Sequence, residues 1–199
     1  MQTKSIAIVI VFAALAITLN PIKIPSFFSG FQLRIYEIPI VIAFMLFGFK
    51  IGFSIQILHL FGQMLLFSGR GIGLGYITGL LAVLSMILGL YMTNFINARS
   101  VFGKKIWSGN RAIILFTAMG TLFRGVIAPI LDYLILYNIF IPITIGSYTQ
   151  EYILSLMPGV ILFNIIVPLY TIPISYYIAK RINKNFKILG IRKNGYFWL

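Results

Sequence analysis

Residues 73–95 read GLGYITGLLAVLSMILGLYMTNF and contain no charged side chain. A helix needs about 20 consecutive apolar residues to cross a hydrocarbon core of about 30 Å, so this stretch predicts a membrane-spanning helix. The rest of the chain has the same character, because 60% of its 199 residues are hydrophobic and only 10% are charged. Lipid offers backbone groups no hydrogen-bond partner, and continuously apolar runs favour helices over the alternating strands of a barrel. We therefore predict an all-α integral membrane protein.

Five further apolar runs surround this segment and complete a six-helix membrane domain. The six predicted spans are Ser5–Leu19, Ile38–Phe49, Gly52–Phe67, Gly73–Phe95, Ala112–Tyr137 and Met157–Ala179. The first run follows a basic residue, as in a signal peptide, yet no small-residue cleavage site closes it, so we interpret it as a retained first helix. We expect residues 1–183 to form one domain and residues 184–199 to form a basic cytoplasmic tail.

Positive charge is concentrated on one side of these six spans. Twelve of the 16 Lys and Arg residues fall on the side that holds both termini, namely Lys4, Lys50, Arg99, Lys104, Lys105, Arg111, Lys180, Arg181, Lys184, Lys187, Arg192 and Lys193. Lys23, Arg34 and Arg70 fall on the opposite side, and Arg124 lies within a span. By the positive-inside rule the first side is cytoplasmic, which predicts a multi-pass protein of the cell membrane with both termini inside. Anionic lipid headgroups, rather than nucleic acid, are then the expected partners of the net charge of +13.

The inventory of reactive residues argues against an enzyme and against a metal centre. The chain has no cysteine, one histidine and three carboxylates, of which Glu37 and Glu151 are predicted in outer loops and Asp132 in a span. An intramembrane hydrolase needs a nucleophile beside a base, or a metal held by acidic and His ligands. We expect His59, one turn from Gln63 on the same helix face, to make an interhelical hydrogen bond rather than to bind a metal. No catalytic residue, metal or cofactor is predicted.

Three polar side chains lie within predicted membrane spans, where burying a polar group in lipid costs free energy. Arg124 is near the middle of its predicted span, where a charge costs about 2.5–3.5 kcal/mol unless a partner neutralises it. Asp132 lies further along the same helix and about 80° around it, so the two residues either form an internal ion pair or address a polar ligand. Asn164 lies in the last span, where Pro168 and Pro173 free backbone carbonyls. These prolines are expected to kink the helix. The kink is either a packing feature or, because it lies beside Arg124, part of a binding site for a solute.

The segments between the spans also carry information. The long outer loop Asn20–Glu37 ends in an alternating stretch that can fold back over the bundle, and loops of this length are usually lids or binding loops. The turn Phe47–Gly52 predicts a tight hairpin between the second and third spans. Gly71, Gly75 and Gly79 recur at four-residue intervals, which predicts that a neighbouring helix approaches closely there.

Four short motifs follow one another along residues 5–183. They are Phe12–Ala16, Tyr36–Pro39, Phe47–Gly52 and Met157–Asn164, with the long outer loop ahead of the second motif. In this order they resemble the substrate-binding S-component of energy-coupling factor (ECF) transporters, and they resemble the riboflavin type most. The resemblance implies an S-component-like bundle of six helices that captures a vitamin from outside and hydrolyses nothing itself.

The resemblance also implies partners and a substrate site. An S-component docks through its first helix onto a transmembrane coupling protein driven by paired cytoplasmic ATPases, and the approximate small-residue face here is Ala7, Ala13, Ala14 and Ala16. Aromatic and polar residues available to hold the vitamin are Phe31, Gln32, Arg34, Tyr36, Arg124, Asp132, Tyr133 and Asn164. Riboflavin is the first candidate. Another heterocycle stays open, because Asn164 is not followed by the Lys and Gly that flavin-type receptors often carry.

Two other classes of protein remain alternatives. A small-molecule transporter or channel subunit that works without ATPases would have the same composition and topology. A membrane-embedded enzyme is the second alternative, although no catalytic set supports it. Copurification with a coupling protein would separate the receptor from the first alternative.

Overall fold

A computed structural model describes residues 3–25, 32–67, 74–98, 110–134, 138 and 150–185. Within these ranges the chain forms six helices and two short strands: α1 (Thr3–Leu19), β1 (Lys23–Pro25), β2 (Gln32–Arg34), α2 (Glu37–Phe47), α3 (Phe49–Phe67), α4 (Leu74–Ala98), α5 (Asn110–Leu131) and α7 (Gln150–Asn185). Four of the helices, α3, α4, α5 and α7, are long and apolar enough to cross a membrane, and α1 and α2 are shorter apolar helices. The predicted all-α, six-helix membrane fold is confirmed.

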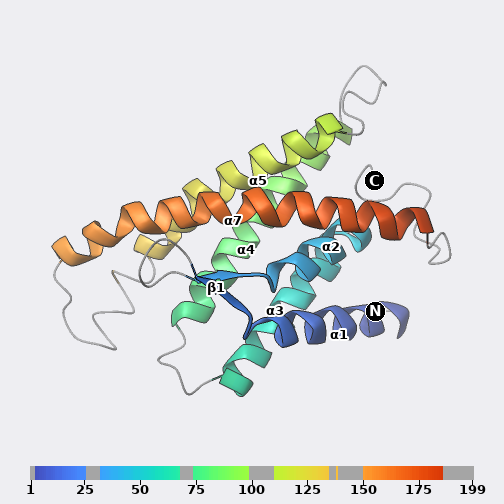
Figure 1. The fold of residues 1–199 in the computed structure, drawn as a ribbon, viewed down its shortest axis with the longest axis horizontal. Helices are drawn as coiled ribbons and strands as arrows, with labels where there is room; N and C mark the ends of the chain where they lie inside the picture. Colours follow the sequence, from blue (N-terminus) through green and yellow to red (C-terminus); the bar gives the residue numbers. More distant parts are fainter. Residues whose placement is uncertain are drawn as a thin grey trace.

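The helices form a bundle with two distinguishable ends (Figure 1). The start of α1 and the end of α7 lie on the same side. We call this side the basic end; it contains the turn at Lys50, the start of α5 at Arg111 and the end of α7 at Lys184. The opposite side, where α1 leads into β1, is the hairpin end. The predicted tail 184–199 lies almost wholly outside the described residues.

The long outer loop contains a small antiparallel sheet that the sequence analysis did not predict. β1 pairs with β2 in the register Lys23↔Arg34, Ile24↔Leu33 and Pro25↔Gln32. Alternation along 31–37 is the signal for β2, since side chains of a strand point alternately to its two faces. The hairpin leads directly from α1 to α2 (Figure 1).

The connection between α2 and α3 is tighter than predicted, because the helices are separated by the single residue Gly48. Gly48 has φ 89°, a left-handed conformation that glycine adopts at little cost. Its N–H donates to the Phe44 carbonyl at 2.8 Å. A Cβ at Gly52 would lie 2.8 Å from the Phe44 Cβ, so glycine is also needed for the close approach of the two helices. The predicted tight hairpin is confirmed.

α2 is too short to cross a membrane and is buried along its length. Its 11 residues extend about 16 Å, roughly half of a hydrocarbon core of about 30 Å, and nine of them are buried. Ser175 of α7 donates a hydrogen bond to the Ile38 carbonyl at 3.2 Å, which places the first turn of α2 well along the 36-residue α7. α2 therefore begins inside the bundle and runs to the basic end.

Glycines bring α4 and α5 together, but not at the predicted positions. A Cβ at Gly89 would lie 2.6 Å from the Met119 carbonyl oxygen and 3.1 Å from the Gly120 Cα. A Cβ at Gly75 would meet no described atom within 4 Å, so the predicted close packing at this glycine is wrong. Gly71 lies outside the described residues, and a Cβ at Gly79 would lie 3.1 Å from the Tyr36 hydroxyl. The intimate contact lies nearer the basic end, where small residues let the backbones approach.

Candidate functional site

The centre of the candidate site is a buried ion pair between helices α5 and α2. Arg124 is 1% exposed and Glu37 is 4% exposed. Two guanidinium nitrogens of Arg124 donate to the two carboxylate oxygens of Glu37, with Nη2 at 3.0 Å from Oε1. This bidentate geometry is the strongest arrangement for a guanidinium and a carboxylate. The charge of Arg124 is thus neutralised by the first residue of α2.

A third helix completes the network. The Nε–H of Arg124 donates to the Asn164 Oδ1 of α7 at 3.0 Å, and the Asn164 Nδ2 donates to the Val160 carbonyl at 3.0 Å. The Met86 sulfur of α4 lies 3.9 Å from the Arg124 Nη1. Arg124 is therefore held by three helices besides its own, and the sequence analysis was right to bring Arg124 and Asn164 together.

Glu37 corrects one prediction of the sequence analysis. It was placed in an outer loop, whereas it is the first residue of α2 and is buried. Of the two explanations for Arg124, the internal ion pair is the observed one, and its partner is Glu37 in place of Asp132. Acidic residues are favoured in the first turn of a helix because the N-terminus carries a partial positive charge. This helix-start signal could have located Glu37.

Asp132 lies at the end of α5, where the helix widens into a π-helical turn at residues 132–134. It is 4% exposed, and its Oδ1 has no hydrogen-bond partner among the described residues. π-helical turns inside α-helices are frequent at functional sites. Asp132 is accordingly a buried carboxylate that lacks one hydrogen-bond donor among the described residues.

Further buried polar groups lie on α3 and beside the hairpin. The Tyr36 ring stacks on His59, with centroids 4.4 Å apart and planes inclined by 26°. Gln63 donates to the Asn20 side chain at 2.6 Å. Both His59 and Gln63 are buried on the same face of α3, as predicted. No group of three or more metal-binding side chains occurs among the residues searched in the described ranges.

The other predicted substrate residues are only partly placed. Phe31 lies outside the described residues, and Gln32 and Arg34 belong to β2 with side chains that are not described. Tyr133 lines an apolar groove of about 470 Å³ between α5 and α7, together with Pro129 and Met157. The groove does not include Arg124, so Tyr133 and the ion pair belong to different surfaces.

The four alanines proposed for docking are divided between two faces of α1. Ala13 is 1% exposed and Ala16 is fully buried, so both pack against the bundle. Ala7 and Ala14 are exposed. Two of the four alanines, Ala7 and Ala14, therefore lie on the face of α1 that a partner can reach.

Comparison with known proteins gives one informative result. No protein-family model and no curated protein matches the chain. A solved structure of the S component of a bacterial ECF transporter matches it with a TM-score of 0.69 and 20% sequence identity, over 94% of this chain and 99% of that chain. The chain has the S-component fold, as the order of its sequence motifs had indicated.

Proposed function

We propose that this chain is the substrate-binding subunit of an ECF-type ATP-driven importer. It captures a vitamin or a similar small heterocycle at the hairpin end and delivers it inward together with a separate ATPase module. The S-component fold supports the class of protein. The observation that carries the proposal is the collection of buried polar groups around the start of α2. Burying polar and charged groups inside a membrane protein costs free energy, and a binding function accounts for that cost.

The geometry of α2 is consistent with binding. A helix that begins inside a membrane bundle leaves polar backbone and side-chain groups at its start, and transporter sites are often built around such interrupted helices. Here the start of α2 presents Tyr36 and Glu37, and the ion pair with Arg124 forms the floor of the proposed site. Asp132 and Tyr36 would contact the substrate directly, and the β1–β2 hairpin would cover it with Phe31, Gln32 and Arg34.

The proposed ligand is an aromatic ring with at least one hydrogen-bond donor. The buried rings of Tyr36 and His59 already stack on each other, and a ring of the ligand would extend this stack. The Asp132 Oδ1, which has no described partner, would accept a donor from the ligand. Riboflavin, which has both features, is the first compound to test. The protein itself catalyses no reaction in this proposal, and the ATPases supply the energy.

Docking is proposed to use the exposed face of α1. Ala7 and Ala14 lie on this face with the strongly exposed Val11 and Ile10 between them. Small residues allow a helix of the coupling protein to approach closely, and the surrounding apolar side chains suit an interface within lipid.

One purification tests this function. The tagged chain is extracted from the cells that naturally make it, and both bound small molecules and bound proteins are identified by absorbance and mass spectrometry. We expect a heterocyclic compound together with a membrane coupling protein and two ATPases. A compound without ATPases, combined with uptake by the chain alone, would favour an ATPase-independent transporter. Absence of any bound compound, with no binding of riboflavin or other vitamins, would contradict the proposal.

A further inference from the structure

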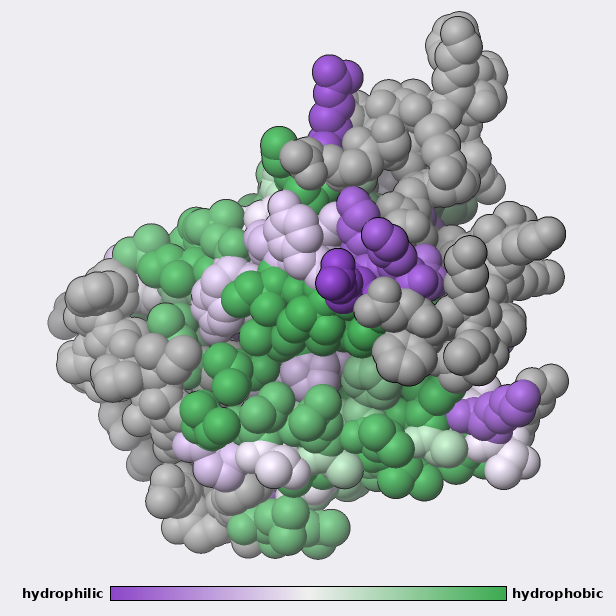
Figure 2. Space-filling model, turned by 45° about the vertical axis from the view of Figure 1, so that its right-hand side comes forward, coloured by the Kyte–Doolittle hydropathy of each residue, from purple (hydrophilic) through white to green (hydrophobic). Residues whose placement is uncertain are grey.

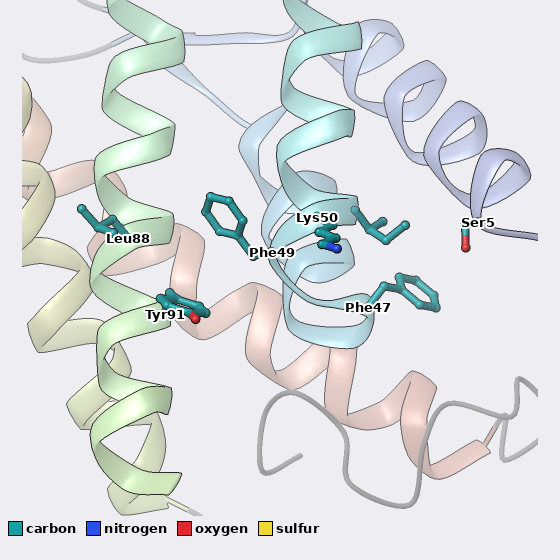
Figure 3. Close-up of a pocket in the computed structure, with 7 residues that line it drawn as sticks. Ser5, Phe47, Phe49, Lys50, Leu88 and Tyr91 are labelled. Atoms are coloured by element: carbon teal, nitrogen blue, oxygen red, sulfur yellow. The ribbon is translucent and has the colours of Figure 1, made fainter. Parts of the chain in front are cut away.

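The basic end contains a pocket that is separate from the site around Arg124. It has a volume of about 610 Å³ and lies between the start of α1, the turn joining α2 to α3, and α4. Its walls include Ser5, Phe47, Phe49, Lys50, Leu88 and Tyr91. Figure 3 shows Lys50 between the aromatic rings of Phe47 and Phe49, with Leu88 and Tyr91 on the facing helix. The volume falls within the roughly 300–1,000 Å³ typical of sites for small molecules.

The pocket combines apolar walls with one cation. Phe49 is 40% exposed and Tyr91 is also 40% exposed, so the pocket is open to the surroundings of the bundle. Phe49 packs near Tyr91 with ring centroids 5.8 Å apart, which forms an aromatic wall. Lys50 lies two residues after Gly48 and is exposed. The space therefore suits a molecule that has an apolar part and a negative charge.

The chain supplies no carboxylate side chain to neutralise Lys50. Its three acidic residues are Glu37, Asp132 and Glu151. Glu37 forms an ion pair with Arg124. Asp132 and Glu151 lie at the hairpin ends of α5 and α7. Lys4, next to the pocket residue Ser5, adds further positive charge beside the pocket. The anion that complements this charge has to come from outside the chain.

We infer that the pocket binds an anionic phospholipid of the cytoplasmic leaflet, with the phosphate at Lys50 and an acyl chain along Phe47, Phe49 and Leu88. The depth of the pocket supports this, because Lys50 lies at the end of the bundle where charged headgroups are expected, and tyrosines such as Tyr91 are enriched at that level. Juxtamembrane cations attract anionic lipid headgroups. A bound lipid would fill the space between α1 and α4. This inference does not depend on the proposed transport function.

The test compares lipids that differ only in headgroup charge. Delipidated wild-type protein in detergent is titrated with phosphatidylglycerol or with phosphatidylcholine of the same acyl chains, and thermal unfolding is followed. We expect phosphatidylglycerol to raise the Tm by several degrees more than phosphatidylcholine does. Inorganic phosphate alone is a separate titration, and an equal Tm shift with phosphate would show that a free anion, rather than a lipid, is bound.

Three variants locate the effect. Lys50→Gln is expected to raise the apparent Kd for phosphatidylglycerol at least fivefold, and Leu88→Trp, which fills the pocket from a partly exposed position, is expected to remove stabilisation by both lipids. Lys184→Gln removes a cation at the same end but outside the pocket, and should behave as the wild type. The inference is overturned if Lys50→Gln keeps the preference for phosphatidylglycerol, or if Lys184→Gln loses it equally.

Discussion

The two ends of the bundle bury different kinds of side chain. On α3 the buried face carries Ile51 and Ile55 toward the basic end and His59 and Gln63 toward the hairpin end. On α5 it changes from Ala112, Ile113 and Phe116 to Arg124 and Asp132, and on α7 Asn164 lies on the hairpin side of Ile172, Tyr176 and Ala179. The buried charged side chains and the histidine thus lie around the start of α2, whereas polar groups buried toward the basic end, such as Thr93 and Ser175, are uncharged hydroxyls.

This difference suggests that different residues stabilise the fold and form the proposed binding site. Apolar residues at the basic end give packing contacts, which are the main source of association between helices in lipid. Buried charges at the hairpin end are costly unless paired, so a protein that only needed stability would gain little from them. We propose that the basic end holds the bundle together and that the hairpin end is kept polar for a ligand. The following substitutions test this division.

The largest effect is expected at the ion pair. Arg124→Ala leaves the Glu37 carboxylate buried without its partner and should lower the free energy of unfolding by about 3–5 kcal/mol, measured by thermal or denaturant unfolding in detergent. Arg111→Ala, at an exposed position of the same helix, should change it by less than about 0.5 kcal/mol. Combining Arg124→Ala with Glu37→Ala should cost less than the sum of the two single changes, because they remove the same interaction. Additive effects would show that the pair is not coupled.

A core substitution at the basic end should come next. Ile55→Ala removes a fully buried side chain of α3 and should lower the free energy of unfolding by about 2–5 kcal/mol. The matched control is Ile114→Ala, at a position that is 68% exposed, and it should have little effect. If the two ends have separate roles, Ile55→Ala leaves the ligand affinity of the folded protein unchanged. A large loss of affinity would contradict that separation.

Asn164→Ala should have a smaller effect on stability. It leaves the Nε–H of Arg124 without an acceptor while the two bonds to Glu37 remain, so the expected loss is about 1–3 kcal/mol in the same unfolding measurement. Asn164→Asp keeps an acceptor oxygen at this position and should retain more stability than the alanine variant. Equal losses in both variants would indicate that the acceptor is not what matters.

Sequence reasoning captured the bundle and only part of the site. Long uncharged runs determine which segments enter lipid, so the number of helices was predictable. The partner of Arg124 was not, because Glu37 is 87 residues away and a pairing across helices leaves no local spacing to recognise. The orientation of α1 was equally hidden, since the helix is apolar on all sides and gives no sign that Ala13 and Ala16 face inward. The predicted second span begins at Ile38, one residue after the observed start of α2 at Glu37, and Pro39 is tolerated in the first turn of this helix.

The most direct test of the account is the ligand affinity of Asp132→Asn. The substitution keeps the shape of the side chain but removes the charge and the second acceptor oxygen at the one buried carboxylate whose Oδ1 has no described partner. Titration of the purified protein with riboflavin, or with the compound extracted from the wild type, should give a Kd at least tenfold higher for Asp132→Asn, with a Tm within about a degree of the wild type. An unchanged Kd for Asp132→Asn would contradict a binding site at the hairpin end.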